Sequence, residues 1–176
     1  MRSDLKDSFS EAHTIRFQEQ LERLKDEHGI LKRELDLIQE QTSHMAAMLG
    51  SEQSKQWLQD IKRQMEQLME KLDRHEQWEE TEIFPILAGY ACQGAEPTFW
   101  TSAWVLEEEH KQTERFVRSF LAYADGCEAA GIPKLNKALS LLCVACSVLT
   151  DQLAAEEETV FPVVDEILGG GAVIDR

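Results

Sequence analysis

Residues 75–85 read HEQWEETEIFP, and residues 152–162 read QLAAEEETVFP. The two stretches follow one pattern, in which a pair of glutamates is followed after two further residues by an aliphatic residue and then by Phe-Pro. The copies differ at their first position, where one has His75 and the other has Gln152. Because residues four apart on a helix point the same way, we expect His75 and Glu79 to share one helical face.

Each copy is preceded by an earlier amphipathic segment in which an acidic residue is followed by a histidine. These histidines are His28, in Asp26-Glu27-His28, and His110, in Glu108-Glu109-His110. Two His/Glu helices that face each other, with a further histidine from each partner helix, form a cage that can hold two metal ions. The pattern therefore predicts a metal site built from four separate segments.

Nearly all of the remaining sequence is typical of helix, because Gly and Pro punctuate the apolar-periodic segments. Apolar residues recur every three or four positions, as on helices with one buried face. Gly50 and Gly131 are predicted breaks, Ser51 is a predicted N-cap, and Pro133 suits the first turn of the last helix. The predicted helices cover about residues 10–49, 51 to between 84 and 90, 97–128 and 133–168.

Four long helices with short connections predict an all-α fold, an antiparallel up-down-up-down four-helix bundle. We expect the bundle to span residues 10–168, between a flexible N-terminus of residues 1–9 and a flexible tail of residues 169–176. The first two helices each carry a stripe that is expected to face inward. These stripes are Phe17, Leu21, Leu24, His28, Leu31, Leu35 and Ile38, and then Leu58, Ile61, Met65, Leu68, Leu72, His75 and Glu79.

The spacing of the special positions from the two predicted turns supports a common layer. His28 lies 22 residues before Gly50 and His75 lies 25 after it, while His110 and Gln152 each lie 21 residues from Gly131. In an antiparallel hairpin, equal distances from the turn mean equal heights, here about 30 Å at about 1.5 Å per residue. All four positions are therefore expected at one level of the bundle interior.

Charged Glu79 and Glu156 on a buried stripe would be costly unless a partner supplied the opposite charge. A divalent cation does so, and neutral histidines offer ring nitrogens with a lone pair. Mixed imidazole and carboxylate ligands suit iron, manganese or zinc better than calcium or magnesium. Iron ranks first here, as two ions or as one, and zinc and manganese rank below it.

Several residues have an ordinary structural interpretation. A single buried histidine is more often a core residue than a ligand, so the convergence of four segments carries the metal hypothesis. His13 and His44 are expected on the surface, and Trp78, Trp100 and Trp104 in the core. Cys143 and Cys146 form Cys-x-x-Cys without a second ligand pair, which favours apolar packing over a zinc or redox role.

Composition restricts the partners. The 176-residue chain has a formal net charge of -15, which argues against binding to nucleic acid or to an anionic membrane. We expect that no apolar stretch reaches transmembrane length, and the N-terminus lacks a signal-peptide apolar region, so a cytoplasmic location is expected. The acid excess is interpreted mainly as a solvated helical exterior, with part of it near the site.

The four segments resemble the hemerythrin-like, or HHE cation-binding, domain family over about residues 10–168. The resemblance implies an antiparallel four-helix bundle with a non-heme di-iron centre bridged by two carboxylates. It assigns ligand roles to His28, His75 and His110, and bridging roles to Glu79 and Glu156. Members of the family carry O2, sense oxygen or redox state, or handle iron and nitric oxide.

Two departures from the family pattern bear on the site. Gln152 replaces a histidine with a weaker amide ligand, so the second ion is expected to be loosely held or absent. Oxygen carriers have a second histidine where this chain has Glu114, which either substitutes as a ligand or pairs with Arg118 on the surface. Fewer imidazoles should favour the ferric state and weaken reversible binding of O2 or another diatomic ligand.

The sequence leaves two interpretations. The first is a metal-binding protein that acts in oxygen or redox sensing or in iron handling, with any protein partner unidentified. An open coordination position would also allow catalysis, but the sequence indicates no substrate pocket or proton donor, which favours a non-enzymatic role. The second is a metal-free helical scaffold or partner-binding protein whose site has decayed at Gln152. Metal content separates them.

Overall fold

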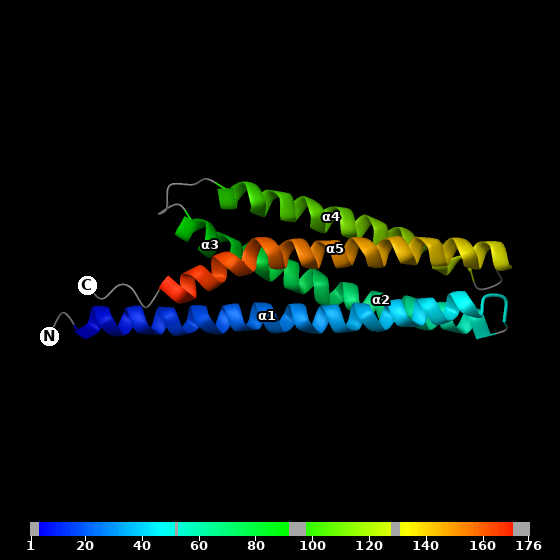
Figure 1. The fold of residues 1–176 in the computed structure, drawn as a ribbon, viewed down its shortest axis with the longest axis horizontal. Coiled ribbons are helices and arrows are strands. Elements are labelled where there is room, and N and C mark those ends of the chain that lie inside the picture. The colour runs from blue at the N-terminus through cyan, green and yellow to red at the C-terminus, as the bar shows by residue number, and fades with distance from the viewer. Residues whose placement is uncertain (1–3, 52, 92–97, 128–130, 171–176) are drawn as a thin grey trace.

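The computed structural model describes residues 4–51, 53–91, 98–127 and 131–170, and they form a four-helix bundle (Figure 1). Its first arm is α1 and its second is a continuous run of α2, the π-helix η1 and α3. The third arm is α4 and the fourth is α5. The bounds are α1 Asp4–Ala47, α2 Gln53–Trp78, η1 Glu79–Ile83, α3 Phe84–Ala91, α4 Thr98–Asp125 and α5 Ile132–Gly170.

Successive arms run in opposite directions, as predicted (Figure 1). The most extensive contacts join α1 to α2 and α5, and join α4 to the same two helices. α1 and α4 therefore lie on one diagonal of the bundle, and α2 and α5 lie on the other. This arrangement lets one layer receive side chains from all four arms.

The first turn owes its geometry to Gly50 and Ser54. Gly50 has a φ of 96°, in the left-handed region where a side chain would be strained. The Gly50 amide donates to Ser54 Oγ at 3.1 Å, and Ser54 Oγ donates to the Met48 carbonyl at 3.1 Å. The predicted break at Gly50 is confirmed, and the buried hydroxyl of Ser54 joins the end of one helix to the start of the next.

The apolar core consists of two clusters with a polar layer between them. The larger cluster fills the end near the two turns and includes Leu31, Leu68 and Leu153. The smaller cluster fills the opposite end and includes Leu24, Ile83 and Val160. The predicted stripes of the first two helices are buried at every position whose side chain is described.

The second arm is interrupted by the π-helix at the position of the predicted site. Pro85 lacks an amide hydrogen, so it cannot donate to the Thr81 carbonyl as a regular α-helix requires. The Phe84 amide instead donates to the Glu79 carbonyl, one residue further back than in an α-helix. Glu79 and Ile83 are both buried within this segment. Apolar periodicity did not indicate this feature.

Several sequence predictions are wrong in detail. α1 begins at Asp4 rather than near residue 10. Trp104 is 62% exposed, because Ala103 and Leu106 occupy the inward face of α4. Cys146 is buried as expected, whereas Cys143 is exposed on the outer side of α5. The side chains of His13, Phe17 and Trp100 lie outside the described residues.

The prediction that no apolar stretch reaches membrane-spanning length is also wrong. Within α5, residues 132–166 contain an 18-residue window with a mean hydropathy of 1.7. By length and composition alone, this helix is long and apolar enough to cross a membrane. A core helix of a bundle passes the same test. α5 packs against both α1 and α4 and contributes to both core clusters.

Candidate metal centre

The polar layer gathers the residues predicted from the four segments. Each is at most 4% exposed, although a histidine or glutamate in a bundle core is normally disfavoured. They come from all four arms of the bundle: His28, His75, Glu79, His110, Gln152 and Glu156. The predicted convergence at one level is therefore present, while the role of these residues as ligands stays a prediction.

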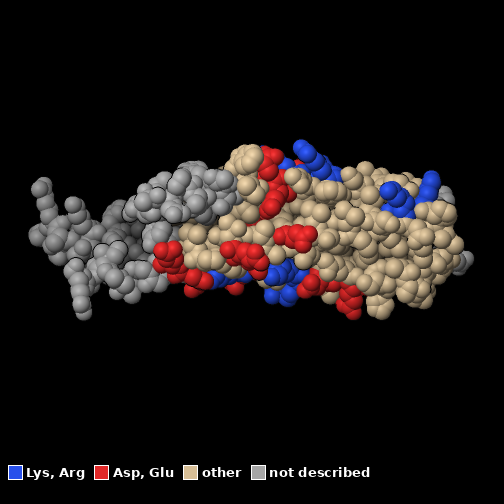
Figure 2. Space-filling model, turned by 45° about the horizontal axis from the view of Figure 1, so that its top comes forward, with Lys and Arg blue, Asp and Glu red and all other residues tan. Residues whose placement is uncertain are grey.

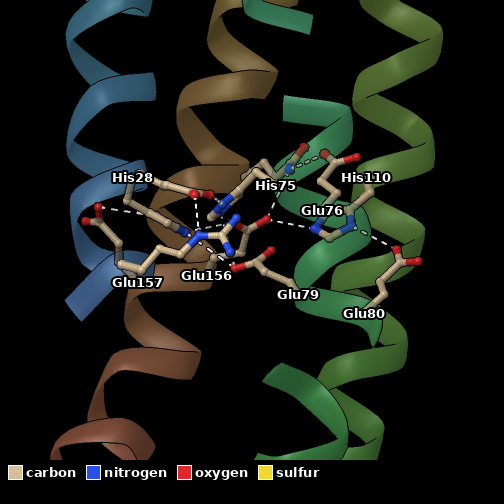
Figure 3. Close-up of polar contacts among 11 residues, drawn as sticks. His28, His75, Glu76, Glu79, Glu80, His110, Glu156 and Glu157 are labelled. Atoms are coloured by element: carbon tan, nitrogen blue, oxygen red, sulfur yellow. Dashed lines mark hydrogen bonds and ion pairs between the residues drawn. The ribbon is translucent and has the colours of Figure 1, made fainter. Parts of the chain in front are cut away.

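Four of these residues form a compact set of candidate ligands. One ligand atom from each of His28, His75, Glu79 and Glu156 lies within 4.8 Å of the other three. His28 Nε2 is 3.4 Å from Glu156 and 3.6 Å from Glu79, and His75 Nε2 is 3.4 Å from Glu79. Figure 3 shows these side chains converging between the helices.

The atoms that face one another in this set lack hydrogen bonds. Within the described part of the chain, His28 Nε2, His75 Nε2, both Glu79 oxygens and Glu156 Oε2 have no hydrogen-bond partner. Such groups cost about 1–3 kcal/mol each when buried unsatisfied, and more when charged. Two imidazoles and two carboxylates that converge without partners fit a divalent cation of the iron, manganese or zinc type.

An outer carboxylate lies beside the far nitrogen of each histidine. Glu27 lies 2.8 Å from His75 Nδ1, Glu80 lies 3.3 Å from His110 Nδ1, and Glu157 lies 3.6 Å from His28 Nδ1. At His75 and His110 the carboxylate is within hydrogen-bonding distance of Nδ1, so a neutral ring carries its proton there and directs its Nε2 lone pair inward. The contact of Glu157 with His28 Nδ1 is longer than a hydrogen bond. In each case the carboxylate comes from a different helix than the histidine, and Figure 3 shows this for Glu80 with His110 and for Glu157 with His28.

Cations hold two of these outer carboxylates in place. Arg23 Nε donates to Glu27 Oε1 at 2.6 Å, and the same guanidinium stacks 4.0 Å above the Trp78 ring. Lys32 Nζ donates to Glu157 Oε2 at 2.8 Å. The orientation of His75 is thus supported by a chain of hydrogen bonds that reaches the exposed side chain of Arg23.

The α4 side of the layer has a different arrangement. His110 Nε2 donates to Glu156 Oε1 at 2.8 Å, and the Gln152 amide donates to the same oxygen at 3.0 Å. Gln152 Nε2 also donates to Glu76 Oε1 at 2.9 Å. Glu156 therefore has one hydrogen-bonded oxygen, Oε1, and one without a partner, Oε2, which faces His28.

Protons substitute for cation charge when no metal is bound. Burial opposes charge on His75, but Glu79 and Glu27 outweigh burial and raise the pKa of His75 to about 9. Burial is likewise outweighed at His110, where Glu156 and Glu76 raise the pKa to about 9. Glu79 is desolvated, yet His28 and His75 lower its pKa to about 2. The layer therefore favours carboxylates that are paired with positive charge.

The comparison with protein families places this site. The hemerythrin HHE cation binding domain matches residues 19–164. This chain belongs to that family. No curated protein and no solved structure significantly matches this chain. The family is a cation-binding one, and the His/Glu layer of this HHE domain is the cluster that could hold the cation.

Glu114 lies outside the layer of this HHE domain. Arg118 Nε donates to Glu114 Oε1 at 2.7 Å on the exposed side of α4, so the structure shows the surface pair that the sequence left as one alternative. His44 is exposed, as expected.

Four further residues near the HHE layer were not predicted as functional: Glu27, Glu76, Glu80 and Glu157. The doubled glutamates of the repeated motif carry the signal for two of them. The first glutamate of each pair faces inward, and the second reaches the histidine of a neighbouring helix. Glu76 had no such signal, because the other copy of the motif has Leu153 at the corresponding position. Its partner is Gln152, the position at which the two copies differ.

Proposed function

We propose that this HHE domain is a non-heme iron protein that acts in oxygen or redox sensing or in iron handling. The observation that carries the proposal is the set of buried, inward-facing ligand atoms without hydrogen-bond partners on His28, His75, Glu79 and Glu156. The family supports cation binding, and the mixed imidazole and carboxylate donors favour iron among the cations. A pair of ions is what the resemblance to di-iron members implies.

The charge of the layer supports a divalent cation. Once the imidazoles are neutral, as metal binding requires, the two carboxylates leave a charge of about -2 in a medium where unpaired ions are costly. A single divalent ion balances that charge and at the same time gives the orphaned atoms a partner. Acidic side chains also gather over the middle of one face of the molecule (Figure 2), which favours the approach of cations over anions.

The protein's own residues hold and orient the metal site. Glu27 and Glu80 hydrogen-bond two of the imidazoles and increase their basicity, and Glu157 lies 3.6 Å from the third. The apolar clusters on both sides keep bulk water out. Bound iron would supply one-electron redox chemistry and an affinity for small diatomic ligands such as O2. This combination suits a sensor or an iron-handling protein better than an enzyme, for which no substrate site is proposed.

An anaerobic ferrous titration followed by exposure to air tests the proposal. We expect saturable Fe(II) binding, and then a near-ultraviolet absorption change as the centre is oxidised. The variant His28→Ala should lose both signals, whereas Glu114→Ala, altered on the surface of α4, should keep them. A folded protein that binds no iron, zinc or manganese would instead favour the metal-free scaffold.

A further inference from the structure

The two halves of the metal layer are chemically unequal, and we propose that the chain binds one cation rather than two. This inference rests on the proposed metal-binding function. The bound ion belongs to the half formed by His28 and His75 with Glu79 and Glu156. The half formed by His110 and Gln152 is a closed hydrogen-bonded copy in which a glutamine–glutamate pair occupies the position of a second ion's ligands.

The repeated motif relates the halves residue by residue. His28 on α1 corresponds to His110 on α4, and Glu79 on the second arm corresponds to Glu156 on α5. The outer contacts obey the same relation, because Glu80 reaches His110 and Glu157 reaches His28. Each difference between the halves can therefore be attributed to a specific substitution.

The first half is open to a cation. Its two Nε2 atoms and the carboxylate oxygens that face them have no hydrogen-bond partner, and the residues that carry them are at most 2% exposed. Glu156 takes part through Oε2 alone. One ion therefore provides a partner for each of these groups and does not need the other half.

The second half already has its partners. His110 Nε2 and Gln152 Nε2 both donate to Glu156 Oε1, and the second amide hydrogen of Gln152 goes to Glu76. A second ion here would have to displace these hydrogen bonds, and in return it would gain one imidazole, a neutral amide oxygen and the Glu156 oxygen that these bonds already satisfy. Gln152 Oε1 has no partner in the described chain, but a lone neutral oxygen is a weak ligand.

Two positions show how the second half departs from the first. Position 76 is a glutamate that pairs with Gln152, whereas the corresponding position in the other copy is the buried Leu153. Glu109 corresponds to Glu27, the outer partner of His75, yet the buried Oε2 of Glu109 has no hydrogen-bond partner. If position 152 were a histidine, Glu109 would be its outer carboxylate, as Glu27 is for His75.

The test is the number of ferrous ions bound per chain, measured by anaerobic calorimetric titration and by elemental analysis after desalting. The natural sequence should bind one ion. His75→Gln, which places the glutamine of the second half in the first, should bind none. Gln152→Leu should still bind one, because Gln152 is not a ligand of that ion.

The double variant Glu76→Leu/Gln152→His makes the second half a copy of the first and should bind two ions. Circular dichroism would establish that each variant keeps its helices. A double variant that stays at one ion would overturn the role given to the Gln152–Glu76 pair.

The outcomes for the natural sequence separate this inference from the proposed function. Two ions per chain would overturn the one-ion inference and leave metal binding intact. No ions in a folded chain would overturn both. One ion that survives His75→Gln but is lost in His110→Ala would place the cation in the wrong half and also overturn the inference.

Discussion

At the scale of single residues, the site depends on pairs of neighbouring side chains with different tasks. Glu79 and Glu156 face the interior, and the residues that follow them, Glu80 and Glu157, support histidines on other helices. The inward glutamates could be predicted because a charge on an apolar stripe requires a partner. The outer ones were not predicted, since a glutamate beside a surface position has the same local pattern as a solvated charge, and only the repetition of the glutamate pair in both copies distinguishes Glu80 and Glu157.

The outer carboxylate of His75 gives a prediction for affinity. Glu27→Gln removes the charge that favours the required tautomer and the basicity of His75, so metal affinity should fall about 10- to 100-fold. Glu22→Gln, on the exposed side of the same helix, is the matched control and should have no effect. Calorimetric titration measures both, and equal affinities for the two variants would contradict the assigned role.

The raised pKa values predict the pH dependence of the metal-free protein. His75 and His110 have pKa values near 9 in the fold against an ordinary 6.5, so the folded state binds protons more tightly than the unfolded chain. Their contribution to stability is complete below about pH 6.5 and is lost as the pH rises through about 9. The melting temperature without metal should therefore fall across this window.

Metal should reverse that trend. The imidazoles must lose their protons to bind a cation, so apparent affinity should increase over the same pH range and binding should release protons. Melting curves at several pH values, with and without ferrous ion, check both statements. A metal-free melting temperature that rises from pH 6.5 to 9 would contradict the raised pKa values.

At the scale of elements, most of the fold could be predicted and one feature could not. The turn at Gly50 and the four amphipathic arms follow from glycine placement and from apolar spacing. The π-helix at Glu79–Ile83 could not be predicted in this way, because a π-helix alters the direction of side chains and leaves no mark in the order of apolar and polar residues. Trp104 was misplaced for a related reason, since its neighbours Ala103 and Leu106 are smaller but face inward.

Pro85 supplies a prediction about the π-helix. Pro85→Ala restores an amide that can donate to Thr81, which should favour a regular α-helix and rotate Glu79 relative to Ile83. Metal affinity should fall about tenfold, in the range found when a supported ligand is disturbed.

Pro162→Ala is the matched change in the other copy. Pro162 lies within α5, where the described helix has no π-helical segment, so its effect on affinity should be smaller. Equal losses from the two proline variants would show that the π-helix does not position Glu79.

At the scale of the whole molecule, the polar layer divides the core into two apolar clusters. The clusters stabilise the bundle by burial, whereas the layer contributes fully only when its charges are paired. Which cation pairs with those charges could not be predicted from the sequence, because imidazole and carboxylate donors serve several metals.

Linkage between binding and folding follows from this division. Free metal at 100 times its dissociation constant should raise the free energy of unfolding by about 2.7 kcal/mol, if the unfolded chain does not bind it. Urea denaturation with and without ferrous ion measures the gain. His28→Ala should remove the gain in stability that metal gives. Leu142→Ala should lower the free energy of unfolding by about 2–5 kcal/mol through a cavity in the larger cluster, but metal should still stabilise this variant. A gain that persists in His28→Ala would place the bound metal elsewhere.

The most direct measurement is an anomalous difference map at the iron absorption edge, from crystals grown with ferrous ion under anaerobic conditions. A peak is expected in the polar layer, in contact with His28, His75, Glu79 and Glu156. A map with no peak among these four side chains, or with iron only on surface carboxylates, would contradict the account.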